Sequence, residues 1–344
     1  ALAILLVYLA QSLRMYLSSE QERKTVRDAF GRYLSPALVE QLAEEPDRLT
    51  LGGEMREMSI LFCDIRGFTA VSERHSPEDL TRLINRFLTP LTQVILDRSG
   101  TIDKYMGDCI MAFWNAPVDV PDHALKACQS ALAMMNALEQ LNNELSEEAA
   151  KSFALQKNET GGGISLHRGK LHGTTTELLR VGVGINTGTA CVGNLGSEQR
   201  FDYSALGDSV NLASRLEGQS KTYGVDILLA EETYAAANQL AAVELDLVQV
   251  VGKTEPVRIF ALIGDETVKD STGFDRLTQL QNDMLGAYRE RQWDNALEII
   301  RQLRNDAAAI SMTRYYDMFD ERVTEFMATP PDSDWDGVER RLVK

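Results

Sequence analysis

Residues Thr101–Trp114, with the sequence TIDKYMGDCIMAFW, give the clearest indication of the fold of this chain. Two short apolar-rich segments, 101–106 and 109–114, flank the pair Gly107-Asp108. A glycine in a two-residue connection between such segments is typical of a β-hairpin. The stretch therefore predicts two antiparallel strands with an aspartate at the tip of their turn.

Helical and strand-like segments alternate on both sides of this hairpin. Met58–Cys63 is a short apolar run that predicts a strand ending at Asp64, after a loop at 46–57. Ser76 before Pro77 predicts the start of a helix that ends at Gly100. Further strands are expected at 179–186, 191–193, 201–205, 225–229, 243–250 and 257–262, and further helices from 122 to about 145 and at 207–216. This order predicts an α+β domain with a largely antiparallel sheet.

The two ends of the chain differ from this central part. Residues 1–10 are all apolar, and basic residues follow from Arg14 onward, so residues 1–17 are interpreted as the end of a transmembrane helix, with a buried helix as the alternative. Residues 18–53 are expected to be linker helices, and 265–344 a helical appendage that packs on the domain. Residues 146–177, which include three consecutive glycines, are expected to be a loop insertion.

The charge balance limits the classes of ligand. The chain has 344 residues, with 35 Lys and Arg against 51 Asp and Glu, and a net charge of −16. Such a surface disfavours nucleic acid, but a divalent cation can still bridge acidic side chains to the phosphates of a nucleotide. No cysteine pair has the CxxC spacing, so Cys63, Cys109, Cys128 and Cys191 are expected to be reduced thiols.

Two aspartates are candidates for metal binding. Asp64 follows an apolar strand, and Asp108 lies at the hairpin tip, so both carboxylates lie at one edge if the strands are neighbours. Two such carboxylates repel each other unless a cation lies between them. Taken singly, Asp64 could be a cap and Asp108 an ordinary turn residue. The loop after Asp64 carries Gly67, which would let backbone N–H groups approach an anion, and its spacing is not that of a P-loop.

Five ordered stretches resemble the signatures of class III adenylyl and guanylyl cyclases, the bacterial membrane-sensor-linked type among them. They are FCDIRGFT at 62–69, DKYMGD at 103–108, GINTG at 184–188, GDSVNLASRL at 207–216 and GKTEPV at 252–257. The resemblance covers residues 54–264. It implies a ferredoxin-like βαββαβ catalytic domain that works as a head-to-tail homodimer with composite active sites.

The resemblance also implies residue roles. Asp64 and Asp108, assisted by the Ile65 carbonyl, would hold two Mg²⁺ or Mn²⁺ ions. Asn211 would orient the ribose and Arg215 would stabilise charge on the reacting phosphates. The remaining contacts with the substrate would come from Gly67, Phe68 and Thr69 in the loop after Asp64, from Lys104 and Ser204 at the base, and from Lys253 at the terminal phosphates.

Lys104 and Ser204, the two residues expected to contact the base and called the base-reading pair here, bear on the choice of substrate. Lys104 could donate to N1 of adenine, whereas guanine has an N1–H group and favours an acceptor such as glutamate. The resemblance thus implies an adenylyl cyclase that converts ATP to 3′,5′-cyclic AMP and pyrophosphate. The alternatives are a guanylyl cyclase of the same fold, because Ser204 binds an amino group less strongly than a carboxylate does, and a catalytically weak nucleotide-binding signalling module. An upstream membrane sensor in the full-length chain and a place at the cytoplasmic face of the membrane are expected as well.

Overall fold

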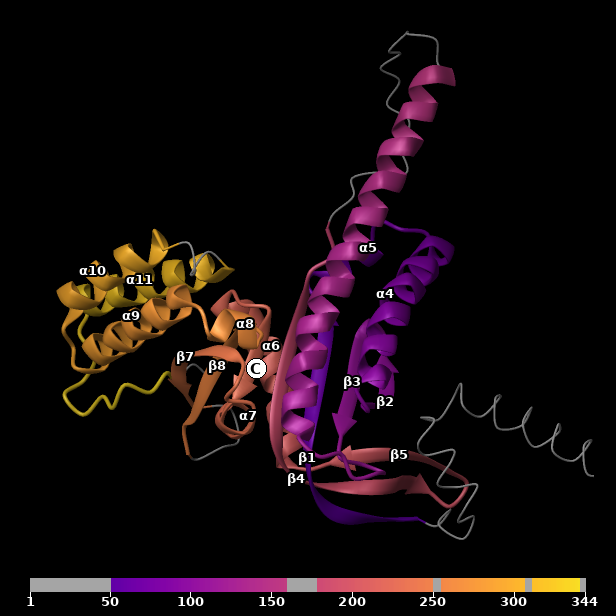
Figure 1. The fold of residues 1–344 in the computed structure, drawn as a ribbon, viewed down its shortest axis with the longest axis horizontal. Helices are drawn as coiled ribbons and strands as arrows, with labels where there is room; N and C mark the ends of the chain where they lie inside the picture. Colours follow the sequence, from indigo (N-terminus) through magenta and orange to yellow (C-terminus); the bar gives the residue numbers. More distant parts are fainter. Residues whose placement is uncertain (1–50, 160–177, 250–254, 307–310, 341–344) are drawn as a thin grey trace, which may run out of the picture.

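The computed structural model describes residues 51–159, 178–249, 255–306 and 311–340 (Figure 1). The expected membrane helix at 1–17 lies outside these ranges, as does the linker apart from residues 51–53. Within the described ranges, no helix is both long and apolar enough to cross a bilayer. The linker expectation is wrong at its end, because Gly52 and Gly53 already belong to a strand.

The core is a βαββαβ unit. Its elements are β1 (Gly52–Ile65), α4 (Pro77–Asp97), β2 (Thr101–Met106), β3 (Cys109–Trp114), α5 (His123–Glu159) and β4 (Val181–Ser197). These four strands pair antiparallel in the order β2-β3-β1-β4. This order is that of a ferredoxin-like sheet, which confirms the predicted α+β fold.

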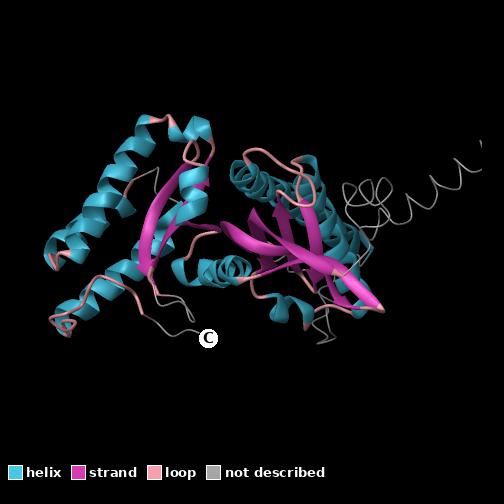
Figure 2. Ribbon diagram, turned by 90° about the horizontal axis from the view of Figure 1, so that it is seen from below, coloured by secondary structure: helices cyan, strands magenta, loops and turns pink. Residues whose placement is uncertain are grey.

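Later elements extend this sheet. They are β5 (Arg200–Leu206), α6 (Asp208–Tyr223), β6 (Ile227–Ala230), α7 (Glu231–Ala236), β7 (Ala241–Val248) and β8 (Val257–Gly264), and a short helix, α3 (Phe68–Ser72), follows β1. β6 pairs parallel with β4, and β8 and β7 continue the sheet beyond it. β5 pairs with the second half of β4, so the two form an arm at one end of the sheet (Figures 1 and 2).

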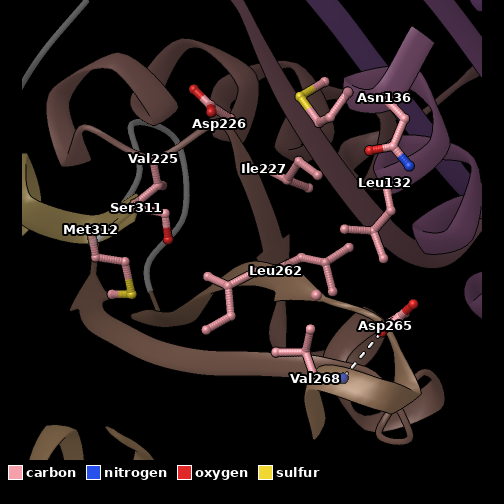
Figure 3. A pocket seen from close by; sticks show the side chains of 13 residues that line it. Leu132, Asn136, Val225, Asp226, Ile227, Leu262, Asp265, Val268, Ser311 and Met312 are labelled. Atoms are coloured by element: carbon pink, nitrogen blue, oxygen red, sulfur yellow. Dashed lines mark hydrogen bonds between the residues drawn. The ribbon is translucent and has the colours of Figure 1, made fainter. Parts of the chain in front are cut away.

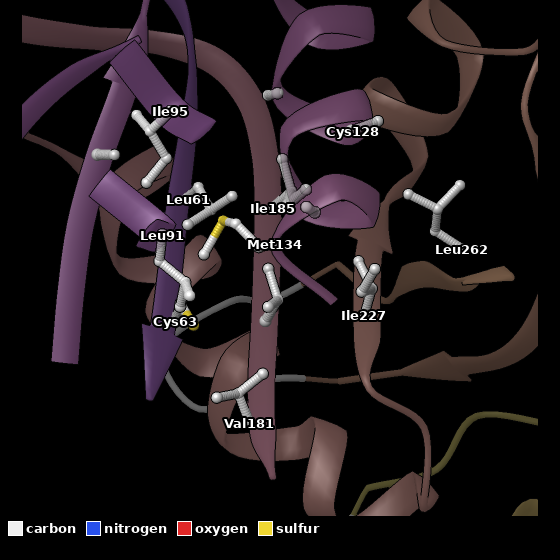
Figure 4. Close-up of a cluster of buried hydrophobic side chains, with 14 of the residues drawn as sticks. Leu61, Cys63, Leu91, Ile95, Cys128, Met134, Val181, Ile185, Ile227 and Leu262 are labelled. Carbon is white, nitrogen blue, oxygen red and sulfur yellow. The ribbon is translucent and has the colours of Figure 1, made fainter. Parts of the chain in front are cut away.

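Helices α4 and α5 cover one face of the central strands (Figure 1). Ser76 caps α4 by accepting a hydrogen bond from the Asp79 N–H, and Pro77 occupies the first turn, as the sequence predicted. Phe87, Leu91 and Ile95 recur at four-residue intervals and are fully buried. They pack with apolar residues of β1, β4 and α5 in one core cluster, of which Figure 4 labels Leu61, Cys63, Cys128, Met134, Val181, Ile185, Ile227 and Leu262.

Helix α6 packs closely on β4, and glycine permits this approach. A Cβ atom at Gly184 would overlap the backbone nitrogen of Glu217 and the carbonyl oxygen of Ala213. The glycine therefore lets the helix backbone rest directly on the strand. This contact fixes the position of Asn211 and Arg215, which α6 carries.

The segment after β8 is helical and packs against β7 and β8, and it is called the appendage here (Figure 1). Its helices are α8 (Glu266–Lys269), α9 (Thr272–Arg289), α10 (Trp293–Arg304) and α11 (Thr313–Ala328). Arg322 of α11 donates to the buried Asp246 of β7 at 2.6 Å, and the Tyr223 hydroxyl of α6 donates to the same carboxylate at 2.8 Å. After α11, Glu339 forms a parallel bridge with Val248.

Three expected boundaries are corrected by the structure. Residues 52–57, expected as loop, are strand because they pair with 189–194 of β4. Thr187 and Gly188, which lie between the strands expected at 179–186 and 191–193, continue β4 because they pair with Ser59 and Met58. The expected loop insertion at 146–177 begins later, since α5 runs to Glu159 through a segment rich in the helix formers Glu, Ala and Lys. Residues 160–177 lie outside the described residues.

Candidate active site

Asp64 and Asp108 lie together at the end of β1. Their carboxylates both accept a hydrogen bond from the Ile65 N–H, Asp64 at 3.0 Å and Asp108 at 3.3 Å. The antiparallel pairing of β1 with β3 places the β2–β3 turn beside this end of β1. Two acids that are 44 positions apart in the sequence are thus brought to one backbone N–H group.

The closeness of the two carboxylates affects the pKa of Asp108. Partial burial and the neighbouring Asp64 carboxylate raise the pKa of Asp108 to about 7. Glu217 of α6 lies near the same pair, and burial followed by the charge of Asp64 raises its pKa to about 7. The side chains at this edge therefore concentrate more negative charge than the nearby cationic side chains neutralise.

This donor set fits a divalent cation. Hard cations such as Mg²⁺ bind through carboxylate and carbonyl oxygens, and Mg²⁺ commonly takes only one or two carboxylates, with phosphates and waters completing its shell. Asp64 and Asp108 supply two carboxylates. Among the described residues, no group of three or more His, Cys, Asp or Glu side chains could hold a metal ion by itself. The geometry thus suits an ion that is shared between the protein and a phosphate ligand.

Arg66 fixes the loop that follows Ile65. Its guanidinium donates to the Val225 carbonyl and, at 3.3 Å, to the Ser220 hydroxyl, and it pairs with Asp226 at 3.4 Å. Gly67 then adopts a left-handed conformation, with φ of 72°, and precedes helix α3. The space where its Cβ would lie is open. The predicted phosphate loop of Gly67, Phe68 and Thr69 therefore begins at a backbone conformation that favours glycine.

The predicted base-reading residues are also in contact. Lys104 of β2 donates to the Ser204 hydroxyl of β5 at 3.1 Å. Both side chains contact Asp103, which accepts from the Ser204 hydroxyl at 2.7 Å and lies 3.1 Å from the Lys104 ammonium. One protomer thus holds these two residues as a unit.

The two predicted catalytic residues lie one turn apart on α6. Asn211 is exposed and Arg215 is half-buried. Nη1 of Arg215 is buried without a hydrogen-bond partner, which is costly for a guanidinium nitrogen and suits an anionic ligand. Lys253, the remaining predicted phosphate contact, lies outside the described residues, so its role stays a prediction.

A separate cavity of about 320 Å³ lies elsewhere on the molecule. Figure 3 shows it between α5, β6 and β8, with Met312 and Ser311 before α11 on one side. Its lining includes the apolar Leu132, Ile227 and Leu262 and none of the predicted site residues. The candidate active site is therefore the carboxylate pair and its surroundings, not this cavity.

Comparison with known proteins agrees with this geometry. Residues 53–264 match the family described as Adenylate and Guanylate cyclase catalytic domain, and the chain belongs to this family. It is 32% identical over 256 residues to an adenylate cyclase of Anabaena cylindrica, and the aligned stretch covers 72% of this chain and 45% of that protein. It is 31% identical over 242 residues to adenylate cyclase 1 of Rhizobium meliloti (strain 1021), and the aligned stretch covers 69% of this chain and 32% of that protein.

The chain therefore spans less than half the length of these two curated relatives. Among solved structures, a bacterial light-regulated adenylyl cyclase matches over 71% of this chain and 63% of that chain, with a TM-score of 0.55 and 22% identity. At this level of identity the likeness shows the fold alone.

Sequence reasoning assigned no role to Asp103, Arg66 or Glu217. Asp103 and Arg66 lie inside the signature stretches, so the sequence placed them near the candidate site but did not indicate their contacts. Their partners come from β5, α6 and the segment before β6, more than 100 residues away. Glu217 lies two residues after Arg215, and only the folded chain shows that its pKa is affected by the carboxylate pair.

Proposed function

We propose that this chain is an adenylyl cyclase that converts ATP to 3′,5′-cyclic AMP and pyrophosphate at the interface of a homodimer. The observation that carries the proposal is the convergence of Asp64 and Asp108 on the Ile65 N–H, at an edge where partial burial and the neighbouring Asp64 carboxylate raise the pKa of Asp108 to about 7. Membership of the cyclase family and the two adenylate cyclase relatives support the same reaction.

The carboxylate pair would hold the catalytic cations. Asp64 and Asp108, with the Ile65 carbonyl, would bind two Mg²⁺ or Mn²⁺ ions together with the triphosphate. When bound, such ions lower the pKa of the attacking 3′-hydroxyl and stabilise negative charge on the phosphates. Gly67 lets the next backbone N–H groups of Phe68 and Thr69 lie near phosphate oxygens.

The residues on α6 would act on the sugar and the reacting phosphate. Asn211 would fix the ribose so that its 3′-hydroxyl faces the α-phosphorus, which lowers the entropic cost of ring closure. The buried, unpartnered Nη1 of Arg215 would donate to a phosphate oxygen whose charge grows in the transition state. Lys253 would neutralise the departing pyrophosphate.

A homodimer is proposed because the residues of one site would come from two protomers. The base-reading unit and α6 of one subunit would complete the carboxylate pair of the other. Large apolar side chains are exposed on β1, β2 and β5: Met55, Tyr105, Met106 and Leu206 are 70%, 45%, 46% and 59% exposed. Such side chains favour a partner surface over bulk water.

Attachment to the cytoplasmic face of the membrane, downstream of a sensor, belongs to the same proposal. It is supported by the apolar residues 1–10 and by the basic residues that follow them. Fractionation of cells that express the chain with and without residues 1–17 tests it. Equal amounts of both forms in the soluble fraction would contradict this part.

The proposed reaction is tested by incubating the purified chain with equal concentrations of ATP and GTP, with Mg²⁺ or Mn²⁺. Cyclic AMP should be the main product. Asp108→Asn should abolish it, whereas the control Asp275→Asn, at an exposed position of α9, should leave the rate unchanged. Cyclic GMP as the main product would favour the guanylyl cyclase alternative, and no product from a folded dimer would favour a silent signalling module.

A further inference from the structure

Asp103 is a buried carboxylate at the base-reading pair. Its side chain is 0% exposed, although it belongs to the half-exposed strand β2. It accepts hydrogen bonds from the Ser204 hydroxyl at 2.7 Å and from the Ala205 N–H at 3.4 Å. Its second oxygen faces the Lys104 ammonium at 3.1 Å. A carboxylate in such a place needs these partners, because burial of an unpaired charge is costly.

The contacts fix the direction of each hydrogen bond. An ionised carboxylate only accepts, so the single proton of the Ser204 hydroxyl is directed to Asp103. Lys104 donates to the same hydroxyl oxygen, which leaves that oxygen with one lone pair and no proton to offer. The ammonium has three N–H donors. One is directed to Ser204, and the Asp103 carboxylate is its ion-pair partner at 3.1 Å, so at least one donor remains for a ligand.

The unit therefore presents one donor on Lys104 beside one acceptor on Ser204. Adenine offers the complement, an N1 acceptor beside a 6-amino donor. Guanine and hypoxanthine offer the reverse, an N1–H donor beside an O6 acceptor. A serine hydroxyl that could rotate would serve either base, since it both donates and accepts. With its proton held by Asp103, it serves adenine alone.

We propose that Asp103 is the specificity-determining positioning residue of this site, which holds the Ser204 proton so that Ser204 is an acceptor beside the Lys104 donor, and so selects ATP over GTP. The inference rests on the proposed role of Lys104 and Ser204 at the base. It adds that selectivity comes from a buried neighbour that does not touch the substrate, and that a serine can thereby replace a carboxylate as the acceptor.

Replacement of the carboxylate by an amide tests this role with little change of shape. In Asp103→Asn, the amide nitrogen can donate to the Ser204 oxygen, so the hydroxyl proton is free to turn toward guanine O6. We expect the ratio of kcat/KM for ATP to that for GTP to fall at least about tenfold, which corresponds to about 1.4 kcal/mol. The control Asp202→Asn changes an exposed aspartate of β5 two residues from Ser204 and should leave the ratio unchanged.

A measurement on the unchanged protein avoids any loss of folding in the variant. Inosine triphosphate differs from ATP at N1 and the 6-position and lacks the 2-amino group of GTP. If the Ser204 proton is held by Asp103, kcat/KM for inosine triphosphate should be at least about tenfold below that for ATP. A value within threefold of that for ATP would show a rotating hydroxyl and overturn the inference.

The outcomes separate this inference from the proposed function. If the unchanged protein prefers GTP, the adenylyl cyclase assignment fails before any variant is made. If it prefers ATP, and Asp103→Asn lowers both rates equally at an unchanged ratio, Asp103 is structural and only the inference fails. A lower ratio in folded Asp103→Asn, together with rejection of inosine triphosphate by the unchanged protein, supports it.

Discussion

The ion pair between Asp246 and Arg322 should decide how firmly the appendage holds the catalytic domain. The two side chains are 1% and 2% exposed, and the Tyr223 hydroxyl and the Leu247 N–H also donate to the carboxylate. Arg322→Ala leaves the Asp246 charge buried without its cation. Removal of one partner of such a pair typically costs about 3–5 kcal/mol in the free energy of unfolding.

The expected shift in melting temperature follows from the size of the chain. An unfolding entropy of about 2.1 cal/mol/K per residue gives about 0.7 kcal/mol/K for the 344 residues unfolding together. A loss of about 3–5 kcal/mol then lowers the melting temperature by about 4–7 °C. Differential scanning calorimetry of the purified chain measures this shift.

Two further variants make the calorimetric test selective. Arg301→Ala removes an arginine that pairs with Glu298 on the exposed side of α10, at 62% and 60% exposure, and should change stability by less than about 0.5 kcal/mol. The double variant Asp246→Asn, Arg322→Met removes both charges and should recover at least half of the loss. A shift for Arg322→Ala no larger than that for Arg301→Ala would refute the reasoning.

Two other predictions concern the site directly. Gly184→Ala should displace α6 and lower both stability and cyclase activity, because the new Cβ overlaps backbone atoms of that helix. Gly218→Ala, with open space at its Cβ in the same helix, should instead stabilise the protein by about 0.5–1 kcal/mol. Urea unfolding of both variants compares them, and equal midpoints would contradict the close packing. The pKa of Asp108 is raised to about 7 from an ordinary value of 3.8, so its contribution to stability is complete below about pH 4 and is lost as the pH rises to about 7. In the presence of a chelator, Asp108→Asn should therefore lose less stability over this window than the unchanged protein, and Mg²⁺ at pH 7.5 should raise the melting temperature of the unchanged protein only; identical pH profiles would argue against the carboxylate pair.

Much of the fold follows from local signals in the sequence. The hairpin at 101–114 and the start of α4 at Pro77 depend on turn and cap residues that act within a few positions. The first half of β1 and the middle of β4 could not be predicted in this way. Polar residues such as Glu54 and the pair Thr187-Gly188 are strand only because β1 pairs along its whole length with residues 181–194 of β4. Long-range pairing here overrides local preference.

The candidate site was likewise predictable from the sequence only in part. The signature stretches identified Asp64, Asp108 and Lys104, and the family resemblance added Ser204. The structure brings Asp64 together with Asp108, and Lys104 together with Ser204. The restraining role of Asp103 depends on a contact between β2 and β5, whose partners are 101 positions apart. A single sequence cannot show which acid in a DKYMGD stretch faces a serine that distant.

The measurement that tests the shared-site account most directly is complementation between two inactive variants. Asp64→Ala removes one metal-binding carboxylate, and Arg215→Ala removes the phosphate-contacting guanidinium that the other subunit would supply. Each variant alone should be nearly inactive with ATP. When the two are mixed and allowed to exchange subunits, cyclic AMP formation should return to about a quarter of the unchanged rate, because half of the dimers are mixed and each mixed dimer has one intact site of two. No recovery in a mixture that demonstrably contains heterodimers would contradict the account.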